Sequence, residues 1–468
     1  MENRLTANDI ETLVVGGGIA GLACAVHLKG HGRTVRLVER NDRLGGVIRT
    51  LDEAGYRIET GPNSLFLRPE DPLLGYIHQT GLEREAVLAG QAGKRRFILK
   101  EGKPVPLPGS ILEGITTPVL SVLGKMRVLR EAFIPPYDPT SPEDPVIETV
   151  AQFVERRFGP DFLDWIIDPF VKGVYASSPE ILSMEDTFPR LTAMEDRYGS
   201  ILRGAVAMQF GPKPPRSPLT RSIFSFQGGM GRLPGALSEL LGTDAGTNAD
   251  VIGITRTPNG FRTALLFDEE TYYLHSRYVV LAGNAIQSSE LLQEICPEAI
   301  GPMTEIPYAP IAVISLGFSR KNVDHPLDGF GLLVPSREKR KILGILFSSS
   351  LFPDKAPEGQ VLLTVFAGGM SNPKLAFAFD EDLIEIVGRE VETILGTKGK
   401  PDFLRIQRWE GAIPQYTPGH RSRIERIAQA LPNGLYLAGA YLSGVSVSQS
   451  FTSGIETARR ILASPPEA

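Results

Sequence analysis

Three glycines near the start of the chain have the spacing needed to hold a dinucleotide. Gly16, Gly18 and Gly21 follow an apolar run at Leu13–Val15, expected to be a buried strand, and open a helix expected at Ala20–Lys29. Gly16 allows a tight turn, Gly18 lets the backbone approach a pyrophosphate, and Gly21 lets helix and strand pack closely. The N–H groups and the positive dipole end at the start of the helix would bind the phosphates. The residues expected there are Gly16, Gly18, Ile19, Ala20 and Gly21.

A carboxylate follows where a dinucleotide-binding unit requires one. The run Val35–Val38 predicts a second strand, and Glu39 stands at its end. A carboxylate there can accept hydrogen bonds from both ribose hydroxyls, and it disfavours a cofactor with a 2′-phosphate. We include the neighbouring Arg40 and, from a strand expected in the middle of the chain, Val251 in the predicted cofactor site.

Two further motifs indicate FAD rather than a nicotinamide cofactor. Arg43-Leu-Gly45-Gly46 resembles the Arg-x-Gly-Gly motif of flavoproteins with a glutathione-reductase-like FAD domain. Its glycines would bring the chain close to the cofactor, and Arg43 would place a fixed charge near the diphosphate. A nicotinamide-dependent dehydrogenase has no use for this motif, so non-covalent FAD is the expected cofactor. The segment that follows and is also assigned to the cofactor is Gly61, Pro62, Asn63 and Ser64.

Composition and charge exclude several other classes of function. The chain has 468 residues, 42% of them hydrophobic, which is enough to bury a large core. Its net charge is −5 and it has no long basic stretch, so nucleic acid is not expected as a partner. Cys24 and Cys296 give neither a disulfide framework nor a metal-ligand spacing. His27 and His31 have no third ligand nearby, so no metal site is expected.

The FAD signals recur in three separated pieces of the chain, which predicts a discontinuous domain. We assign 1–85, 220–290 and 405–468 to the FAD-binding domain, 86–98 and 291–404 to a substrate-binding domain, and 99–219 to a helical domain. The expected fold class is α/β. It combines a Rossmann-like FAD domain of the glutathione-reductase and amine-oxidase type with an α+β substrate domain and a helical, membrane-associating insert. The strands expected outside the first motif are 261–267, 272–274, 311–318, 331–334, 342–347, 361–366 and 435–438, and the helices are 381–395 and 450–462.

Residues 110–135 leave two interpretations of the helical insert open. The segment is fairly apolar and carries Lys125, Arg127 and Arg130, which suits peripheral attachment to a membrane. An ordinary core-facing pair of helices would show the same pattern. The leader Met1–Glu11 shows no signal peptide, and no apolar run reaches about 18 residues. A cytoplasmic protein, peripheral at the inner face of the cell membrane, is therefore expected.

The intervals between the FAD motifs resemble the oxygen-dependent protoporphyrinogen oxidase family. Lys94–Pro108 is similar to the segment that enters the substrate cavity in that family, and Asp168–Met184 is similar to its second signature. Gly329–Gly369 contains its third region, and Trp409–Tyr416 completes the set. Ser177-Ser178 departs from the family pattern of Gly-Asp, so the backbone near this point is expected to run differently.

The resemblance implies a site for a flat, apolar macrocycle with propionates at one end. Such a ligand requires aliphatic or aromatic walls and one or two cations. Leu333 and Leu346 would form one wall, and Phe366 would be the facing ring that stacks on a pyrrole. Arg96 would pair with a propionate, and Gly173 would allow the backbone to approach closely. The C-terminal residues assigned to the cofactor are Trp409, Gly439, Val445, Ser446 and Val447.

The resemblance also implies a reaction in heme biosynthesis. Protoporphyrinogen IX would lose six hydrogens and become protoporphyrin IX, in three cycles of hydride transfer to N5 of FAD. Dioxygen would reoxidise the flavin after each cycle and give hydrogen peroxide. No acid–base pair stands out in the motifs, so we name no catalytic residue. Hand-over of the product to a ferrochelatase and formation of an oligomer are further expectations for its partners.

Three alternatives remain at this point. A flavin-type coproporphyrinogen III oxidase would act on a substrate with four propionates, whereas Arg96 in its Arg-Phe context favours two. A flavin amine oxidase or a carotenoid desaturase shares the FAD domain, and Tyr416 and Tyr441 could form the aromatic cage that binds an amine. A non-enzymatic escort protein for prenylated proteins reuses the domain without flavin, but the motif that begins at Arg43 speaks against it.

Overall fold

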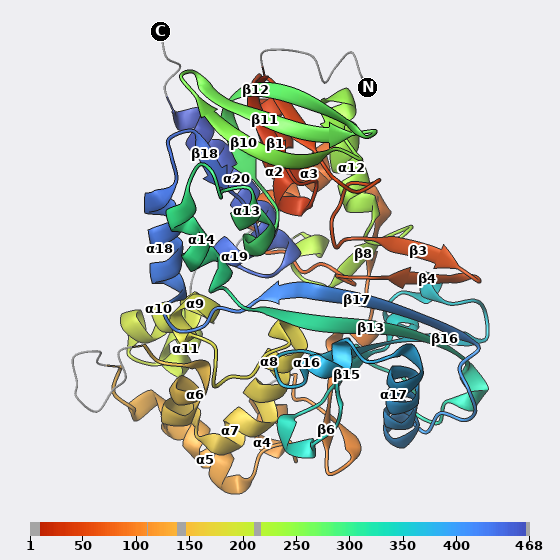
Figure 1. The fold of residues 1–468 in the computed structure, drawn as a ribbon. Coiled ribbons are helices and arrows are strands. Elements are labelled where there is room, and N and C mark those ends of the chain that lie inside the picture. The colour runs from red at the N-terminus through yellow and green to blue at the C-terminus, as the bar shows by residue number, and fades with distance from the viewer. Residues whose placement is uncertain (1–9, 110, 138–146, 210–216, 465–468) are drawn as a thin grey trace.

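The computed structural model describes residues 10–109, 111–137, 147–209 and 217–464. The polar leader up to residue 9 lies outside the described residues. Figure 1 shows one large sheet at the top, a second large sheet across the lower half, and helices α4 to α11 at the lower left. The predicted α/β fold class is confirmed.

The upper sheet contains a parallel layer that the N-terminal motif opens. β1 (Ile10–Val15) pairs with β2 (Val35–Val38) on one side and with β12 (Glu270–Leu281) on the other. β9 (Ala245–Gly246) extends the layer beyond β2, and β18 (Leu435–Leu437) extends it beyond β12. The layer therefore joins strands from all three pieces that the sequence assigns to the FAD-binding domain.

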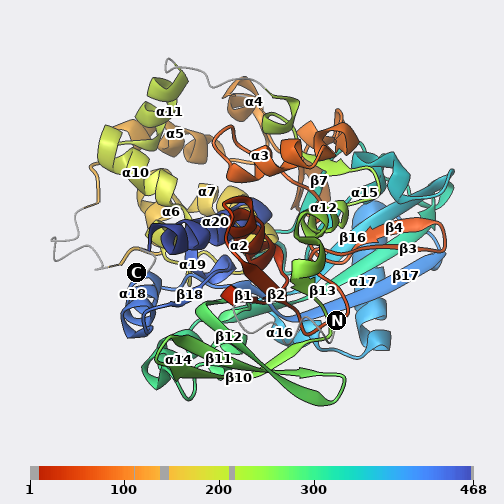
Figure 2. The same cartoon turned by 90° about the horizontal axis from the view of Figure 1, so that it is seen from above.

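Helices cover this layer and pack on one another. α2 (Ile19–Gly30) contacts α12 (Arg232–Leu241) and α20 (Val447–Ala463). A Cβ on Gly454 of α20 would lie only 2.0 Å from the carbonyl oxygen of Ala20, so the glycine lets the two helix backbones touch. Figure 2 shows α2 and α20 side by side.

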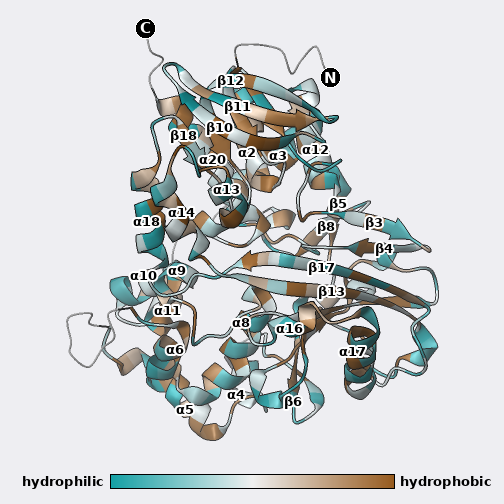
Figure 3. Cartoon of the chain, viewed as in Figure 1, coloured by the Kyte–Doolittle hydropathy of each residue, from teal (hydrophilic) through white to brown (hydrophobic). Residues whose placement is uncertain are grey.

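An antiparallel meander forms the outer edge of the upper sheet. β10 (Asp250–Thr257) pairs with β11 (Gly260–Phe267), and β11 pairs with the first part of β12. Alternate residues such as Phe261 and Leu265 are buried, as the period of two in the sequence predicts. In Figure 3 the apolar stretches of β1 and β12 lie inside this domain.

The second sheet has the strand order β17-β13-β16-β15-β14-β6-β7. These strands are β17 (Phe403–Pro414), β13 (Tyr308–Ser319), β16 (Gln360–Gly368), β15 (Ile342–Leu346), β14 (Gly331–Leu333), β6 (Phe97–Lys100) and β7 (Lys103–Pro106). α17 (Asp380–Leu395) covers one face, where its Leu383 and Val387 share a core with Ala312 and Ile314 of β13. The opposite face is therefore left for other contacts.

Two segments of this sheet lie across the predicted domain boundaries. β17 pairs with β13 along most of its length, so residues 405–414 lie in the substrate sheet rather than with the FAD-binding strands. β6 and β7 extend the other edge to Pro106, beyond the predicted boundary at residue 98. A local pattern predicts a strand but not its distant pairing partner, which is why both boundaries differ.

A buried ion network holds the helical region together. The guanidinium of Arg157 is fully buried and donates to Glu131 (3.1 Å) and to Glu195 (2.8 Å). Burying a charge is tolerated only when it is paired and hydrogen-bonded, as it is here. The elements of this region are α4 (Ile111–Thr116), α5 (Val122–Arg130), η3 (Glu131–Phe133), α6 (Val150–Phe158), α7 (Pro160–Phe162), α8 (Asp168–Tyr175), α9 (Met184–Thr187), α10 (Pro189–Tyr198) and α11 (Ile201–Gln209).

Shorter elements connect these layers. They are β3 (Thr50–Glu53), β4 (Tyr56–Glu59), α3 (Pro72–Gln79), β5 (Ala86–Leu88), β8 (Phe224–Phe226), α13 (Ala285–Glu290), α14 (Pro297–Thr304), α15 (Ser348–Leu351), η9 (Pro353–Lys355), α16 (Pro373–Ala376), α18 (His420–Ala430) and α19 (Ala440–Ser443). Within the described part of the chain, no helix combines the length and the apolar character that a membrane span requires.

Candidate active site

The first glycine motif has the geometry of a phosphate-binding turn. Gly16 has a φ of +108°, and a Cβ on Gly21 would lie 2.0 Å from the carbonyl oxygen of Gly16. Gly18 is the N-cap of α2 and supplies no side-chain cap, and among the described residues no heavy atom beyond Gly18 and its two neighbours lies within 4 Å of the position that its Cβ would take. The first N–H groups of α2, which belong to Ile19 and Ala20, therefore face an open space.

The carboxyl ends of three parallel strands meet beside this turn. Gly16 follows β1, Gly283 follows β12 and Gly439 follows β18. A Cβ on Gly16 would lie 3.3 Å from the nitrogen of Gly283, and a Cβ on Gly439 would lie 3.3 Å from the oxygen of Gly283. The sequence prediction did not include Gly283. The Gly-Asn pair at the end of a buried strand is the pattern that could have indicated it. Ligands of open α/β sheets bind at such strand ends.

Glu39 is bound to the turn itself. Its Oε2 accepts the N–H of Gly17 at 2.7 Å, and its Oε1 accepts the N–H of Asn41 at 2.9 Å. The side chain of Asn41 also donates to Oε1. A carboxylate offers about four acceptor sites, and these three hydrogen bonds use three of them. One site on Oε2 is left for a ribose hydroxyl, whereas the sequence predicts hydrogen bonds from both ribose hydroxyls.

Val251 and Arg40 lie at the same end of the sheet. The N–H of Ala249 donates to the carbonyl of Glu39 at 2.9 Å, which holds the start of β10 beside the carboxylate. Val251 is buried, whereas Arg40 is exposed. Val251 can therefore contribute an apolar surface to this end of the predicted site.

The second glycine motif packs directly on the first. The N–H of Gly45 donates to the carbonyl of Gly17 at 2.7 Å, and a Cβ on Gly46 would lie 3.1 Å from the Cα of Gly18. A Cβ on Gly61 would lie 2.2 Å from the carbonyl oxygen of Val47. Close backbone contacts thus link the start of α2 to Gly61, and we call this stretch the glycine surface.

Arg43 is turned toward its own loop. Its Nη1 donates to the carbonyls of Leu44 (3.2 Å) and Ile48 (3.3 Å), and its Nη2 donates to the carbonyl of Gly46 (2.5 Å). Burial, and then the neighbouring Arg49, lower the pKa of this guanidinium. The predicted charge therefore fixes the glycine loop, a role that its position in the motif did not reveal.

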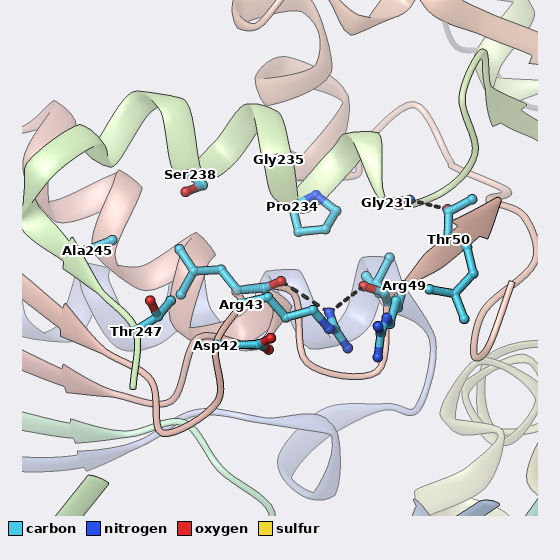
Figure 4. Close-up of a pocket in the computed structure, with 13 residues that line it drawn as sticks. Asp42, Arg43, Arg49, Thr50, Gly231, Pro234, Gly235, Ser238, Ala245 and Thr247 are labelled. Atoms are coloured by element: carbon cyan, nitrogen blue, oxygen red, sulfur yellow. Dashed lines mark hydrogen bonds between the residues drawn. The ribbon is translucent and has the colours of Figure 1, made fainter. Parts of the chain in front are cut away.

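A groove of about 610 Å³ lies between this loop and α12 (Figure 4). In Figure 4, Arg43 and Arg49 project from the loop and Pro234 faces them from α12. The groove is lined by Asp42, Arg43, Leu44, Ile48, Arg49, Thr50, Leu51, Gly231, Pro234, Gly235, Ser238, Ala245 and Thr247. Arg43 is the one residue of the predicted site in this lining, so the groove is distinct from the glycine surface.

A residue of the second sheet holds the chain just before the segment Gly61–Ser64. The indole Nε1 of Trp409, on β17, donates to the carbonyl of Thr60 at 2.6 Å. The side chain of Asn63 donates to the carbonyl of Gly61 at 3.0 Å. Gly61, Pro62, Asn63 and Ser64 are all half-buried.

The C-terminal helix starts earlier than the sequence predicts. α20 begins at Val447 because Ser446 caps it in a capping box with Gln449, whose N–H donates to the Ser446 hydroxyl at 3.2 Å. Val445 and Val447 are half-buried, and Ser446 is exposed.

Together these residues fit FAD. The open start of α2 would hold the phosphates, the free side of Glu39 would bind a ribose hydroxyl, and a ring system would lie near Gly61–Ser64. Bound in this way, FAD would be held without a covalent link.

One face of the second sheet carries the predicted substrate residues. The register pairs Leu333 with Gly344, and Gly344 with Phe366, so these three positions share a face. Leu346 lies two residues beyond Gly344 on β15 and shares it too. Strands are about 4.8 Å apart, so the Cα atoms of Leu333 and Phe366 are separated by roughly 10 Å. Gly344 has no side chain, so the side chains of Leu333 and Phe366 flank a bare stretch of backbone, which we call the slot.

Phe366 and Trp409 link this slot to the predicted flavin segment. Phe366 packs with the cluster around Leu346 and also with the cluster that contains Ile311 and Trp409. Ile311 pairs with Trp409, and Val313 pairs with both Phe366 and Gln407, which puts Phe366 and Trp409 on the same face. The face opposite α17 is therefore the one that meets Thr60.

Gly173 of α8 lies against the slot. A Cβ on Gly173 would lie 2.5 Å from Cδ2 of Leu333. Phe170 and Val174, on the same face of α8, are 42% and 41% exposed, although large apolar side chains of a helix facing a packed sheet are normally buried. The exposed face of α8 thus adds apolar surface beside Leu333.

α8 is fixed to the substrate sheet by Asp168. Its carboxylate accepts the N–H (2.6 Å) and the hydroxyl (2.7 Å) of Ser336, in the loop after β14. Burial raises the pKa of Asp168 and lowers the pKa of Lys172, which lies one turn further along α8. Beyond α8, Ala176 adopts a left-handed φ of +48°, and its carbonyl accepts the N–H of Met370 (2.8 Å). This contact ties the segment before Ser177 to the sheet.

Arg95 and Arg96 are neighbours in sequence but have different partners. Arg95 forms an ion pair with Asp328. Arg96 is exposed, and its guanidinium lies 5.5 Å from the ring centre of Phe330. Within the described residues Arg96 has no carboxylate partner, so its guanidinium is free to bind an external carboxylate.

Two residue pairs that the sequence singles out do not form sites. Tyr416 and Tyr441 are 3% and 1% exposed, and Tyr416 donates to the carbonyl of Ala440, so they offer no cage open to an amine. His27 Nδ1 lies 2.7 Å from the hydroxyl of Tyr76, and its ring contacts His31 at 4.4 Å. Among the described residues, no group of three or more His, Cys, Asp or Glu could hold a metal ion.

The family model for flavin-containing amine oxidoreductases matches residues 19–462. The chain belongs to this family. It is accordingly a flavin-dependent oxidoreductase, and the motifs described above identify the flavin as FAD. The matched range begins inside the first glycine motif and includes the second motif, the whole second sheet and α20 up to residue 462.

Relatives of this family member are similar over nearly the whole chain. Protoporphyrinogen oxidase 2, chloroplastic/mitochondrial, of Arabidopsis thaliana is 32% identical, covering 96% of this chain and 93% of its own. Coproporphyrinogen III oxidase of Bacillus subtilis is 26% identical, covering 94% and 96%. A crystal structure from Exiguobacterium sp. 255-15, of a protein provisionally named protoporphyrinogen oxidase, has a TM-score of 0.79 and 26% identity, covering 97% and 99%.

Proposed function

We propose that this chain oxidises protoporphyrinogen IX to protoporphyrin IX, with dioxygen as electron acceptor and hydrogen peroxide as second product. The plant relatives that carry the protoporphyrinogen oxidase name over nearly the full chain support it. One observation carries the proposal. Leu333 and Phe366 stand on either side of Gly344, on the sheet face whose Trp409 is bonded to Thr60. A slot with apolar sides beside a flavin segment suits the edge of a flat macrocycle.

The chain's own residues would act by positioning the substrate. Leu333 and Phe366 would hold a pyrrole ring between them, and Leu346 would keep water from the slot. Gly173 would let α8 approach the macrocycle without a side chain in between. Bound FAD would supply the hydride acceptor. None of these lining residues can exchange a proton, so we assign them binding and orientation only.

Arg96 would recognise a propionate. A planar guanidinium without a carboxylate partner can bind a carboxylate through two parallel hydrogen bonds. Phe330, under the guanidinium, would keep it in place. The polar end of the substrate would then lie near β6, and the apolar rings would extend toward Leu333.

Coproporphyrinogen III is the second candidate substrate, supported by the Bacillus subtilis relative. Its four propionates would need more than one cation at the rim of the slot. Arg95, the nearest other arginine in sequence, is already paired with Asp328. We therefore favour the substrate with two propionates.

Aerobic turnover tests the proposed function directly. The purified chain, loaded with FAD, should convert protoporphyrinogen IX to a fluorescent porphyrin and release peroxide in a ratio of about three per porphyrin, as three hydride transfers require. Parallel assays with coproporphyrinogen III should give a lower kcat/KM. Faster turnover of coproporphyrinogen would replace our choice with the second candidate, and no porphyrin from either substrate would reject both.

We further propose peripheral contact with the inner face of the cell membrane, from the cytoplasm. The support is an exposed apolar surface, the α5 face, which consists of Val122, Leu123, Met126, Leu129 and Phe133 and is 54–82% exposed. Apolar residues repeat on one side of α5 while Lys125, Arg127 and Arg130 flank them, which suits binding at an anionic lipid surface. These side chains point to solvent, which favours membrane attachment over the core-facing helix pair that the sequence also allowed.

A ferrochelatase is a further proposed partner, because of the chemistry of the product. Protoporphyrin is apolar and flat, so transfer to a ferrochelatase at the same membrane surface would spare it contact with water. An oligomer would be compatible with such an assembly. Co-sedimentation of the purified chain with a ferrochelatase on vesicles would test the transfer, and light scattering would give the oligomeric state.

A further inference from the structure

Two oppositely directed ion pairs join β4 to η9. On β4, Arg57 and Glu59 lie two residues apart and share a face. Arg57 donates to Asp354 at 2.7 Å, and Glu59 is paired with Lys355. β4 thus presents a positive then a negative charge, and η9 presents a negative then a positive one.

The two pairs differ in burial. The side chains of Lys355 and Glu59 are 3% and 1% exposed, whereas those of Arg57 and Asp354 are 25% and 39% exposed. Exposed pairs contribute little, because water and salt screen them. A buried pair is strongly destabilised when one partner is lost, because an uncompensated charge remains. The Glu59–Lys355 pair is therefore the stronger restraint.

Glu59 is also the centre of a network from three parts of the chain. It accepts the hydroxyl of Thr50 (2.7 Å) and the N–H of Met230 (3.0 Å). Thr50 in turn accepts the N–H of Gly231 at 2.8 Å. The ammonium of Lys355, by contrast, has Glu59 as its one hydrogen-bond partner among the described residues.

The pair connects the two halves of the proposed active site. Glu59 stands two residues before Gly61, at the entrance to the flavin segment. Lys355 lies in the connection from β15 to β16, the strands that carry Leu346 and Phe366. Trp409 holds Thr60 by a single hydrogen bond from one side, and Lys355 holds Glu59 by charge from the other.

We infer that Lys355 is a positioning residue, which acts through Glu59 to set the flavin segment Gly61–Ser64 at a fixed distance from the substrate slot. This role rests on the proposed function for its effect on turnover, but its effect on FAD binding does not depend on the substrate. Losing Lys355 would free the flavin segment to shift relative to the sheet. A misplacement of about 1 Å between reacting groups can cost about 100-fold in rate.

Three variants separate this role from general stability. Lys355→Met removes the charge and leaves Glu59 with two donors, Thr50 and Met230, but without a counter-ion, so we expect a lower Tm and measure FAD affinity at a temperature where the variant is folded. Lys355→Arg keeps the charge. Asp354→Asn removes the neighbouring, exposed pair and is the matched control.

FAD affinity, from quenching of FAD fluorescence by the apoprotein, is the readout that requires no substrate. We expect the Kd for FAD to rise about tenfold in Lys355→Met, which corresponds to the loss of one charged hydrogen bond. Lys355→Arg should recover most of the affinity, and Asp354→Asn should stay within about twofold of the parent. A Kd for Lys355→Met equal to that of Asp354→Asn, or no recovery with arginine, would overturn the inference.

Turnover gives the second readout. In Lys355→Met saturated with FAD, kcat for protoporphyrinogen should fall about 10- to 100-fold, with KM changed far less, because the substrate walls are intact while the flavin is displaced. A rise in KM with unchanged kcat would contradict the positioning role. If the parent chain oxidises no porphyrinogen, the proposed function fails, while the FAD-binding measurement still decides whether Lys355 positions the flavin segment.

Discussion

Gly173 and Leu333 lie in direct contact, although they belong to the helical region and to the substrate sheet. The absent Cβ of Gly173 leaves a gap that Cδ2 of Leu333 enters, since a Cβ there would be 2.5 Å from it. The wall of the proposed slot is therefore set by a residue outside the sheet. The size of residue 173 determines how far Leu333 reaches into the slot.

Gly173→Ala should push Leu333 toward Phe366 and narrow the slot. Overpacking of this kind costs about 1–3 kcal/mol, so we expect kcat/KM for protoporphyrinogen to fall about 5- to 150-fold, mainly through KM. The double variant Gly173→Ala/Leu333→Val should recover part of the affinity, because valine keeps an apolar wall but lacks the Cδ2 atom that clashes. Steady-state kinetics measure both, and equal loss in the single and double variants would count against contact with Leu333 as the cause.

Arg96→Ala should remove the proposed propionate contact. A charged hydrogen bond is worth about 1.5–3 kcal/mol, so kcat/KM should fall roughly 10- to 150-fold while FAD content stays normal. Arg95→Ala is the matched control, because Arg95 is paired with Asp328 and should change turnover little. Loss of FAD in the Arg96 variant would place this residue at the cofactor instead.

The contiguous motifs could be predicted because their spacing encodes backbone geometry. The turn at Gly16–Gly21 and the strand before Glu39 follow from residues that are close in sequence, and the structure has them as β1, α2 and β2. Side-chain direction is not encoded in this way. The motif predicts Arg43 near the diphosphate, which stays a prediction, and only the fold shows that its guanidinium binds the carbonyls of its own loop.

Contacts between residues that are distant in sequence could not be predicted for a different reason. Lys355 and Glu59 look like surface charges in sequence, and only the fold buries them together. The periodicity of α5 predicts an apolar stripe but not what covers it, because the spacing is the same whether the stripe packs on a core or faces solvent. The slot at Gly344 likewise depends on the register of β14, β15 and β16, which no local pattern determines.

Trp409→Phe should weaken FAD binding without changing the apolar wall. The variant keeps an aromatic ring but loses the hydrogen bond from Nε1 to the carbonyl of Thr60. A neutral hydrogen bond contributes about 0.5–1.5 kcal/mol, so the Kd for FAD should rise about two- to tenfold. Fluorescence titration of the apoprotein checks this, and an unchanged Kd would show that Thr60 is held adequately without the indole.

His27 should make the stability of the fold depend on pH. Burial, with smaller contributions from His31 and Arg459, lowers its pKa from 6.5 to about 4. The folded-state pKa is below the unfolded value, so the unfolded chain binds the proton more tightly. The stabilisation from neutral His27 is complete above pH 6.5 and is lost as the pH falls toward 4.

His27→Gln should therefore flatten the dependence of Tm on pH in this window. The variant also loses the contact with Tyr76, so its Tm at neutral pH should be lower. His78→Gln, at a side chain that is 51% exposed, is the matched control for the substitution itself. Parallel Tm profiles for the parent and His27→Gln would show that another group titrates there.

Leu123→Glu/Leu129→Glu should abolish binding to anionic vesicles. These side chains of the α5 face are 71% and 70% exposed, and burying one leucine is worth about 1.5–3 kcal/mol. Adding carboxylates also repels an anionic surface, so partitioning measured by co-sedimentation should fall at least about tenfold. Turnover of a soluble substrate should be unaffected, because α5 lies outside the proposed slot.

Phe379→Glu tests whether any exposed apolar residue would behave in this way. Phe379 precedes α17 in the second sheet's domain, is 79% exposed and does not belong to the α5 face. Vesicle binding should survive this substitution, since the lipid contact is local to α5. Equal loss of binding in both variants would mean that attachment depends on overall charge, whereas retained binding in the α5 variant would remove the membrane role of this face.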